Sequence, residues 1–130
     1  MKRCAVGGTS ECSRGVSAAG LPGFLYWVHI PYKPGAKRRP ALVVSPDSCN
    51  RLASDVIVVP LSSVLREAPT HVRLRVREGG LVRPSVVKCE QISTLRRDRL
   101  APGPLGSNLA PARMVEVEKA ILRALGIPVS

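Results

Sequence analysis

Short apolar runs separated by turn residues dominate the chain from residue 24 onward. Residues 24–30 (FLYWVHI), 41–45 (ALVVS) and 55–61 (DVIVVPL) are rich in β-branched and aromatic residues, a composition typical of strands. Residues 84–94 predict one further strand or a pair of short strands that contain Cys89. Pro84 suits only the edge or the first position, because proline donates no hydrogen bond to a ladder.

Residues 70–77 alternate strictly between apolar and polar side chains. The apolar set is Val72, Leu74 and Val76, and the polar set is His71, Arg73, Arg75 and Arg77. Successive side chains of a strand point to opposite faces, so this segment predicts a strand with one buried and one wet face. Three arginines would then share the wet face.

Proline and glycine predict the loops and turns between the strands, and a helical periodicity predicts the last element. Residues 31–39 hold two prolines, a glycine and four cations and predict a loop, Pro46–Asn50 predicts a turn, and Gly79–Gly80 permits another. A terminal helix is predicted from Pro111 at its first position to Gly126 and Pro128 beyond its end. Its apolar stripe consists of Met114, Val117, Ile121 and Leu125.

These elements define one domain. Residues 1–22 are rich in Gly, Ser and Ala without strand or helix periodicity and predict a disordered tail, so residues 23–130 form the folded unit. Several short strands with one terminal helix predict a mainly β fold, a small barrel that carries a C-terminal α-helix.

Charge and composition narrow the partners. The formal net charge of +11 and the pI near 10.6 point to a polyanionic partner such as nucleic acid or an acidic protein. The longest apolar runs fall far short of the roughly 20 residues that span a bilayer, and the N-terminus lacks the apolar core of a signal peptide. We therefore expect a cytoplasmic protein with no membrane partner.

No pattern of metal or cofactor ligands is present in the sequence. The four cysteines form no C-x2-C pair and the two histidines, His29 and His71, lie at no ligand-like spacing to them, so we expect free thiols, no metal and no cofactor. The two histidines also invite a paired acid–base mechanism. We favour strand histidines bonded to their neighbours, just as we favour core or dimer contacts over base stacking for Tyr26 and Trp27.

The sequence contains no Walker loop, zincin helix, nucleophile elbow or dinucleotide fingerprint, and its few carboxylates lie mostly in the tail, in turns or on the helix. RNA can nevertheless be cut without a metal, because the 2′-hydroxyl is a built-in nucleophile and the protein need only move protons and stabilise charge. Arginine suits this task, since its planar fork of donors matches phosphate oxygens. Arg39, between a cationic loop and a buried strand, is a candidate on these grounds.

Five blocks in order resemble the MazF/PemK family of toxin endoribonucleases over about residues 25–127. They are RRPALVVSPDSCN, DVIVVPLSS, PTHV, PSVVKCEQISTL and ARMVEVEKAILRALGI. The resemblance implies an SH3-like β barrel with a C-terminal helix, a homodimer and an antitoxin partner of the MazE type with an acidic C-terminal segment. It also implies sequence-specific, metal-independent cleavage of single-stranded RNA to 2′,3′-cyclic phosphate and 5′-hydroxyl ends, which inhibits growth.

The resemblance assigns catalytic roles to Arg39 and Ser62. Ser62 departs from the family, which has threonine there; it keeps the hydroxyl but loses the methyl group that restricts χ1. A second departure is the short segment before Arg39, which lacks the glutamate that many members carry. Because arginine is a poor general base, we expect Arg39 to stabilise the transition state and, as a second role, to help protonate the leaving group.

Other residues are candidates for binding RNA. Lys37, Arg38, Ser63 and Lys88 would contact phosphates or support the strand end, and Gln91 would contact a base or hold the dimer geometry. The arginine face of residues 73–77 would bind RNA or an acidic antitoxin segment. Two alternatives to an endoribonuclease stay open: a non-catalytic RNA-binding barrel, and a CcdB-like toxin that shares the barrel but targets gyrase.

Overall fold

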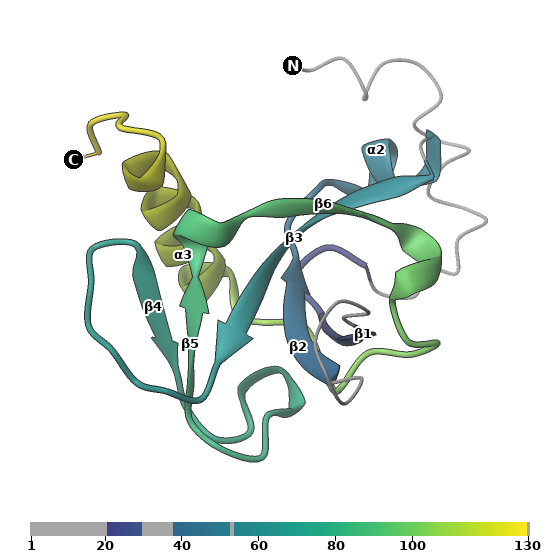
Figure 1. Ribbon diagram of the computed structural model, residues 1–130, viewed down its shortest axis with the longest axis horizontal. Coiled ribbons are helices and arrows are strands. Elements are labelled where there is room, and N and C mark those ends of the chain that lie inside the picture. Colours follow the sequence, from purple (N-terminus) through teal and green to yellow (C-terminus); the bar gives the residue numbers. More distant parts are fainter. Residues whose placement is uncertain (1–20, 30–37, 53, 130) are drawn as a thin grey trace.

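A computed structural model of the chain describes residues 21–29, 38–52 and 54–129 (Figure 1). Apart from Leu21 and Pro22, the predicted tail of residues 1–22 lies outside these ranges, and so does most of the predicted loop of residues 31–39. The strands are β1 (Leu25–His29), β2 (Arg38–Val43), β3 (Asp55–Ser62), β4 (His71–Leu74), β5 (Ser85–Lys88) and β6 (Ser93–Arg96). The helices are α2 (Asp47–Leu52) and α3 (Pro111–Ala124), with short 3-10 turns η2 (Glu78–Gly80), η3 (Cys89–Gln91) and η4 (Arg97–Arg99).

The strands form one antiparallel sheet in the order β1-β2-β3-β5-β4, and β6 also pairs with β3. The long strand β3 serves both halves: residues 55–58 pair with β6, and its last two residues pair with β5. The sheet therefore bends around β3, and α3 packs behind the β4–β5 half (Figure 1).

Alternating side chains fill two cores on the two faces of the sheet. One core includes Leu42, Val59 and Leu61 and is covered by Val117 and Ala120 of α3. The other lies among β1, β2 and the first half of β3, and it consists of Tyr26, Val28, Ala41, Val43, Val56 and Val58. At roughly 2 kcal/mol for each fully buried aliphatic side chain, these cores supply the main favourable term of folding.

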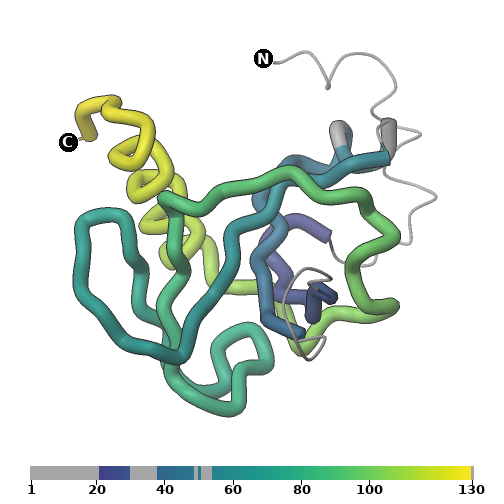
Figure 2. Tube along the Cα trace, in the orientation of Figure 1, coloured from purple at the N-terminus to yellow at the C-terminus, as the bar shows by residue number. Residues whose placement is uncertain are grey.

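The segment from residue 97 to residue 110 runs along the outer edge of β1 to the start of α3 (Figure 2). The N–H groups of Ala101, Leu105 and Leu109 donate to the carbonyl oxygens of Trp27, Leu25 and Gly23, at 2.8–2.9 Å. These bonds pair an edge strand that would otherwise be open to another chain.

This segment also crosses the η2 turn at backbone contact. Gly80 has φ +94°, and a Cβ built on it would lie 2.4 Å from the carbonyl oxygen of Leu105. A Cβ on Gly106 would likewise lie 2.7 Å from the Cα of Gly80. Only glycine permits this crossing, because any side chain would collide with main-chain atoms.

Most of the predicted elements are confirmed. β1, β3 and the pair β5 and β6 lie where the apolar patterns place them, and α3 begins at Pro111 as expected. Met114 and Ile121 pack on the core with Val117, whereas Leu125 is 61% exposed just beyond the last turn. Gly79 and Gly80 both have positive φ, as the predicted turn requires.

The predicted turn at Pro46–Asn50 is wrong, because α2 occupies Asp47–Leu52. The Asn50 side chain is fully buried; its amide donates to the carbonyl oxygen of Ser45 at 2.9 Å, and the Ser45 hydroxyl donates to its Oδ1. The N–H of Ile57 in turn donates to the Ser45 hydroxyl at 3.1 Å. The Asn50 side chain thus joins a buried hydrogen-bond network with Ser45, instead of bonding to its own backbone as it would in a turn.

Two strand boundaries also differ from the prediction. β2 begins at Arg38 rather than Ala41, since Arg38 and Arg39 pair with His29 and Val28 of β1. The predicted strand of residues 70–77 ends at Leu74; Arg77 has φ +78° and the supposedly inward Val76 is 46% exposed. Cys89 lies in η3, directly after β5, rather than in a strand.

Candidate active site

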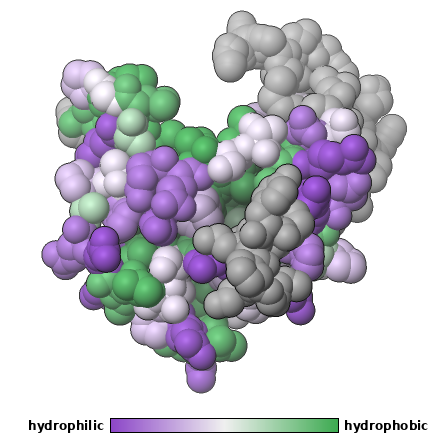
Figure 3. Space-filling model, viewed as in Figure 1, coloured by the Kyte–Doolittle hydropathy of each residue, from purple (hydrophilic) through white to green (hydrophobic). Residues whose placement is uncertain are grey.

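The strand register decides which side chains share the face of the sheet that is turned away from α3. One row of paired residues belongs to the core beneath α3, and its members are Leu61, Val87 and Val72. Side chains alternate along a strand, so the adjacent row points to the opposite face; its members are Ser62, Val86 and Arg73. This opposite face is the one seen in Figures 1 and 3.

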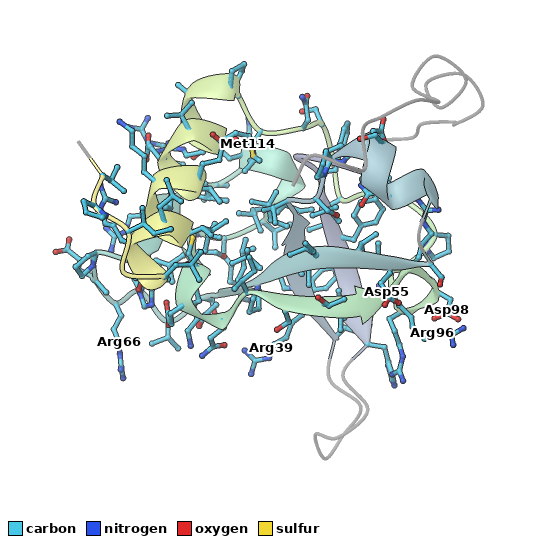
Figure 4. All side chains as sticks on the ribbon, turned by 90° about the horizontal axis from the view of Figure 1, so that it is seen from above. Arg39, Asp55, Arg66, Arg96, Asp98 and Met114 are labelled. Carbon is cyan, nitrogen blue, oxygen red and sulfur yellow. The ribbon has the colours of Figure 1, made fainter. Side chains whose placement is uncertain are left out.

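Arg39 of β2 continues the same row. β2 and β3 are antiparallel, and their paired residues end at Ala41 opposite Pro60. Continued by two residues, this register places Arg39 opposite Ser62 on the same face, and both residues line one hollow. Figure 4 shows the Arg39 side chain projecting from the sheet on the side away from α3. The two residues predicted to be catalytic, 23 positions apart in the sequence, are thus brought together by strand pairing.

Two hollows open on either side of Arg39, each with a cavity volume of about 660 Å³. The first, the Ser62 hollow, is lined by Arg39, Ser62, Ser63, Arg38, Trp27, Arg83 and the η2 crossing at Gly80 and Leu105. The second, the Lys88 hollow, is lined by Arg39, Lys88, Gln91, His29, Thr94, Arg96 and Arg99. Arg39, Pro40 and Leu61 line both hollows, so the Arg39 guanidinium can bind a ligand that occupies both.

The Ser62 hydroxyl is oriented by the turn that follows β3. The N–H of Val64 donates to Ser62 Oγ at 3.1 Å, the local bond typical of a serine turn. This bond uses one lone pair and leaves the hydroxyl hydrogen free to be donated to another acceptor. The hydroxyl is therefore held without the methyl group of threonine.

The basic residues around Arg39 differ in their partners. The Arg38 guanidinium lies 5.1 Å from the centre of the Trp27 ring, a cation–π distance. Arg96 pairs with Asp98 at 2.8 Å, and this hydrogen bond lowers the pKa of the Asp98 carboxyl. Among the described residues, no carboxylate forms an ion pair with Arg39 or Lys88. Their charges are therefore available to an anionic ligand.

Most of the predicted site residues meet here. Arg38, Ser62 and Ser63 line the Ser62 hollow, and Lys88 and Gln91 line the Lys88 hollow. Lys37 lies outside the described residues, as does the rest of the short segment before Arg38. The roles assigned to all of these residues stay predictions.

Among the lining residues that the sequence analysis did not single out are Arg83, Thr94, Arg96 and Arg99. Thr94 and Arg96 reach the Lys88 hollow because β6 pairs with the first half of β3, and Arg99 follows in η4. No local signal marks them, since a run of arginines after a strand is most often a solvated face.

The two histidines do not form an acid–base pair. His29 lies on β1 and His71 on β4, the two ends of the five-strand path. His71 is held by Glu90, whose Oε2 lies 3.1 Å from its Nε2, and by the carbonyl oxygen of Arg66, 2.9 Å from its Nδ1. For His71 this outcome agrees with the expectation of a strand histidine bonded to its neighbours, whereas His29 is exposed and lines the Lys88 hollow.

Comparison with known proteins places the chain in a family. Residues 22–125 match the family described as PemK-like, MazF-like toxin of type II toxin–antitoxin system. The chain belongs to this family of toxins, and the resemblance noted in the five sequence blocks is confirmed.

Individual relatives cover most of the chain. An endoribonuclease MazF of Staphylococcus epidermidis is 32% identical over 91 residues, which is 68% of this chain and 74% of that protein. A solved mycobacterial endoribonuclease in complex with its cognate antitoxin is 33% identical, with a TM-score of 0.70 over 86% of this chain and 100% of that chain. A MazE–MazF structure from Deinococcus radiodurans is 26% identical, with a TM-score of 0.70 over 85% and 99%. The mainly β, SH3-like barrel with a C-terminal helix is thereby confirmed.

The described residues contain neither a cluster of metal ligands nor a membrane-spanning helix. No three side chains of His, Cys, Asp or Glu in the described ranges gather closely enough to hold a metal ion. The helices within the same ranges are all too short or too polar to cross a membrane.

Proposed function

We propose that this toxin is a sequence-specific endoribonuclease that cleaves single-stranded RNA, with Arg39 and Ser62 at the reaction centre. The observation that carries the proposal is the position of Arg39: opposite Ser62, between two basic hollows, with no ion-pair partner among the described residues. The family and the relatives named as endoribonucleases support the same activity.

The chemistry needs no metal because the nucleophile belongs to the substrate. The 2′-oxygen attacks the adjacent phosphorus, a bond forms between them, and the bond from phosphorus to the 5′-oxygen breaks. The 2′-hydroxyl gives its proton to solvent, and the departing 5′-oxygen gains a proton from solvent with the help of Arg39, which leaves a 2′,3′-cyclic phosphate and a 5′-hydroxyl. The Arg39 guanidinium binds the non-bridging oxygens as their charge grows, and Ser62 donates its hydroxyl hydrogen to one of them.

The remaining hollow residues bind the strand on both sides of the cut. Arg38, Lys37 and Ser63 contact phosphates on the side of the Ser62 hollow, and Lys88 does so on the other side. Gln91 of η3 lines the Lys88 hollow and reads a base edge with its amide.

The same proposal includes an antitoxin partner with an acidic segment, a homodimer and action in the cytoplasm. Both of the solved structures described above are complexes, one with a cognate antitoxin and one of MazE with MazF, which supports the antitoxin partner. Exposed apolar side chains at the end of α3, Leu122, Leu125 and Ile127, support self-association. Light scattering of the purified chain at several concentrations measures whether it forms a homodimer.

The deciding experiment incubates the purified protein with a mixed-sequence RNA in EDTA. Wild type is expected to cut at a few defined sites, and mass spectrometry of the fragments to show cyclic phosphate and 5′-hydroxyl ends. Arg39→Ala is expected to cut at least about 100-fold more slowly, because a charge-stabilising group is lost. Arg75→Ala removes an exposed arginine that lines neither hollow and is the matched control.

Three outcomes would contradict the proposal. Binding without cuts would assign the chain to non-catalytic RNA binding, and cuts abolished by EDTA would remove the metal-independent mechanism. Inhibition of gyrase without RNA cleavage would assign it to the CcdB-like alternative.

A further inference from the structure

A third hollow lies beyond Ser62, on the side away from Arg39. It has a cavity volume of about 440 Å³ and is lined by Arg66, Glu67, Ala68, His71, Arg73 and Val86. We propose that this Arg73 hollow binds backbone phosphate of the same RNA strand that is cut at Arg39, an inference that rests on the proposed function. It makes Arg66 and Arg73 positioning residues for the substrate.

The register aligns the Arg73 hollow with the reaction centre. Val86 of β5 pairs with Ser62 on one side and with Arg73 on the other. With Arg39 opposite Ser62, one row crosses four neighbouring strands on a single face of the sheet. Adjacent strands are about 4.8 Å apart, so the backbones at Ser62 and Arg73 are separated by about 10 Å. An RNA strand laid along this row from Arg39 meets Arg73 next.

The side chains of the row suit a phosphate at its far end. Val86, which lies between Ser62 and Arg73, is 2% exposed and has no polar side-chain group that could bind an RNA phosphate. Arg73 is therefore the next polar residue of the row after Ser62. Arg73 is exposed, and Figure 4 shows Arg66 projecting to the same side of the molecule as Arg39. Figure 3 shows hydrophilic side chains gathered on this face over β4 and β5.

The charges of the hollow are positive and available. None of the ion pairs among the described residues includes Arg66 or Arg73. Glu67 is the one carboxylate that lines this hollow and offsets half of the two arginine charges. A planar guanidinium presents paired donors to phosphate oxygens, which an unpaired arginine in a hollow is well placed to use.

The wall of the hollow is fixed rather than loose. His71, whose side chain is 8% exposed, holds the carbonyl oxygen of Arg66 at 2.9 Å from its Nδ1. Its Nε2 lies 3.1 Å from Glu90, which also accepts a hydrogen bond of 2.9 Å from the hydroxyl of Thr70. These bonds tie the backbone of Arg66 to β4 and to η3, which carries Gln91 of the Lys88 hollow.

The structure separates the three arginines that the sequence pattern places on one face. Arg73 is in β4 and lines the hollow, whereas Arg75 follows the end of the strand and its N–H donates to Glu78 beside α3. Arg77 stands in the turn with positive φ. Neither Arg75 nor Arg77 lines the hollow, so together they form a control with the same total charge.

The test uses an RNA that contains the site cut by wild type, with a 2′-O-methyl group at the reacting nucleotide so that it binds without being cut. Fluorescence anisotropy gives its affinity between about 50 and 200 mM salt for wild type, for Arg66→Ala/Arg73→Ala and for Arg75→Ala/Arg77→Ala. Each lost phosphate contact lowers the magnitude of the slope of log K against log salt by about 0.7 for a single strand. The slope of the first variant is therefore expected to be smaller by about 0.7 if one phosphate is bound and by about 1.4 if two are bound. Across that range the wild type then loses roughly threefold to sevenfold more affinity than this variant. The control variant is expected to keep the wild-type slope.

A methylphosphonate scan locates the contact. Replacing one phosphate at a time with a neutral methylphosphonate is expected to weaken wild-type binding at one or two positions on one side of the cut. At those positions the Arg66→Ala/Arg73→Ala variant is expected to show no further loss, because the partner charge is already gone.

The outcomes keep the two proposals distinct. If wild type does not cut RNA, the proposed function fails. If wild type cuts RNA but the Arg66→Ala/Arg73→Ala variant keeps its salt slope and its methylphosphonate pattern, only this inference is overturned. It is likewise overturned if the variant loses binding of a labelled polyglutamate peptide with RNA binding unchanged, since the hollow would then serve an acidic protein.

Discussion

At the scale of single residues, Ser62 ends β3 with its hydroxyl already engaged by the N–H of Val64. Threonine restricts its hydroxyl by crowding at χ1, whereas here a main-chain donor does so, and the two devices orient the same oxygen. The replacement of the family's threonine is therefore compatible with an active site.

Substitutions at Ser62 separate the hydroxyl from its setting. Ser62→Ala is expected to lower kcat about 100- to 1,000-fold, the range seen when one donor to a developing charge is removed. Ser62→Thr is expected to stay within a few-fold of wild type, because the hydroxyl is kept. Single-turnover cleavage of one RNA by the three proteins measures this, and normal cleavage by Ser62→Ala would exclude a role for the hydroxyl.

Cys89 is a second residue with a distinct setting. Its side chain is fully buried, and burial, followed by the nearby charge of Glu90, raises the pKa of the Cys89 thiol to about 12. The thiol is therefore protonated at neutral pH and poorly nucleophilic.

We expect iodoacetamide at pH 8 to leave Cys89 unmodified in the native protein and to alkylate it in urea. Mass spectrometry of the peptide that contains Cys89 distinguishes it from the other three cysteines. Alkylation at equal rates in both conditions would show that η3 opens in the native state.

At the scale of elements, the start of β2 shows how pairing overrides composition. Three cations before a proline are typical of a loop, yet Arg38 and Arg39 are strand residues because β1 offers them His29 and Val28 as partners. The end of β4 shows the reverse, since the alternating pattern continues to Arg77 but no ladder follows Leu74. The local sequence pattern therefore predicts where a strand lies better than where it ends, because the end depends on a neighbouring strand that is distant in the sequence.

The ion pair of Glu78 with Arg113 joins the η2 turn to α3. The Glu78 carboxylate accepts two bonds from the Arg113 guanidinium, at 3.0 and 3.1 Å, and one from the N–H of Arg75. Burial alone would raise the pKa of Glu78, but these hydrogen bonds outweigh it and lower the pKa overall. The link is only about a quarter exposed and is therefore poorly screened.

Glu78→Gln is expected to destabilise the fold by about 1–2 kcal/mol at pH 7, because a charged hydrogen-bond pair is lost. Glu116→Gln, which alters the 53% exposed partner of the same arginine, is expected to cost less than about 0.5 kcal/mol. Because the pKa of Glu78 is lower in the folded state, its ionised carboxylate stabilises the fold at pH values above the unfolded pKa of about 4.3. This stabilisation is lost as the pH falls through the folded-state pKa. Urea unfolding should thus find that the difference between wild type and Glu78→Gln shrinks as the pH falls below about 4.3, and a difference that stays constant would contradict this account.

At the scale of the whole molecule, the net charge of +11 governs encounter with RNA. We expect kcat/KM to fall steeply with added salt while kcat changes little, because screening weakens attraction at a distance but not contacts already formed. Steady-state cleavage from about 50 to 300 mM salt measures both constants. An equal fall in kcat would place the salt effect on the reaction centre instead.

Much of the whole-molecule architecture was predictable. Apolar patterns predicted the β barrel and the terminal helix, and the resemblance of the five sequence blocks singled out Arg39 and Ser62. That these two residues lie together was learned from the strand register and the shared hollow. The contributions of Arg99 and Arg66 were not predictable from the sequence. The first depends on how β6 pairs with β3, and the second depends on the His71 side chain, which holds the backbone of Arg66. Such contacts follow from tertiary geometry that no local spacing encodes.

Alternation along β2 has one last consequence, for deletions. Pro40 and the residues after it fix the register with β3, so a chain that lacks Arg39 brings Arg38 into the place opposite Ser62. We expect the in-frame deletion of Arg39 to retain far more cleavage than Arg39→Ala, which leaves a methyl group in that place. Assayed side by side on one RNA, equal loss in both would refute this. Two consecutive arginines therefore allow the toxin to keep an arginine opposite Ser62 after one of them is deleted.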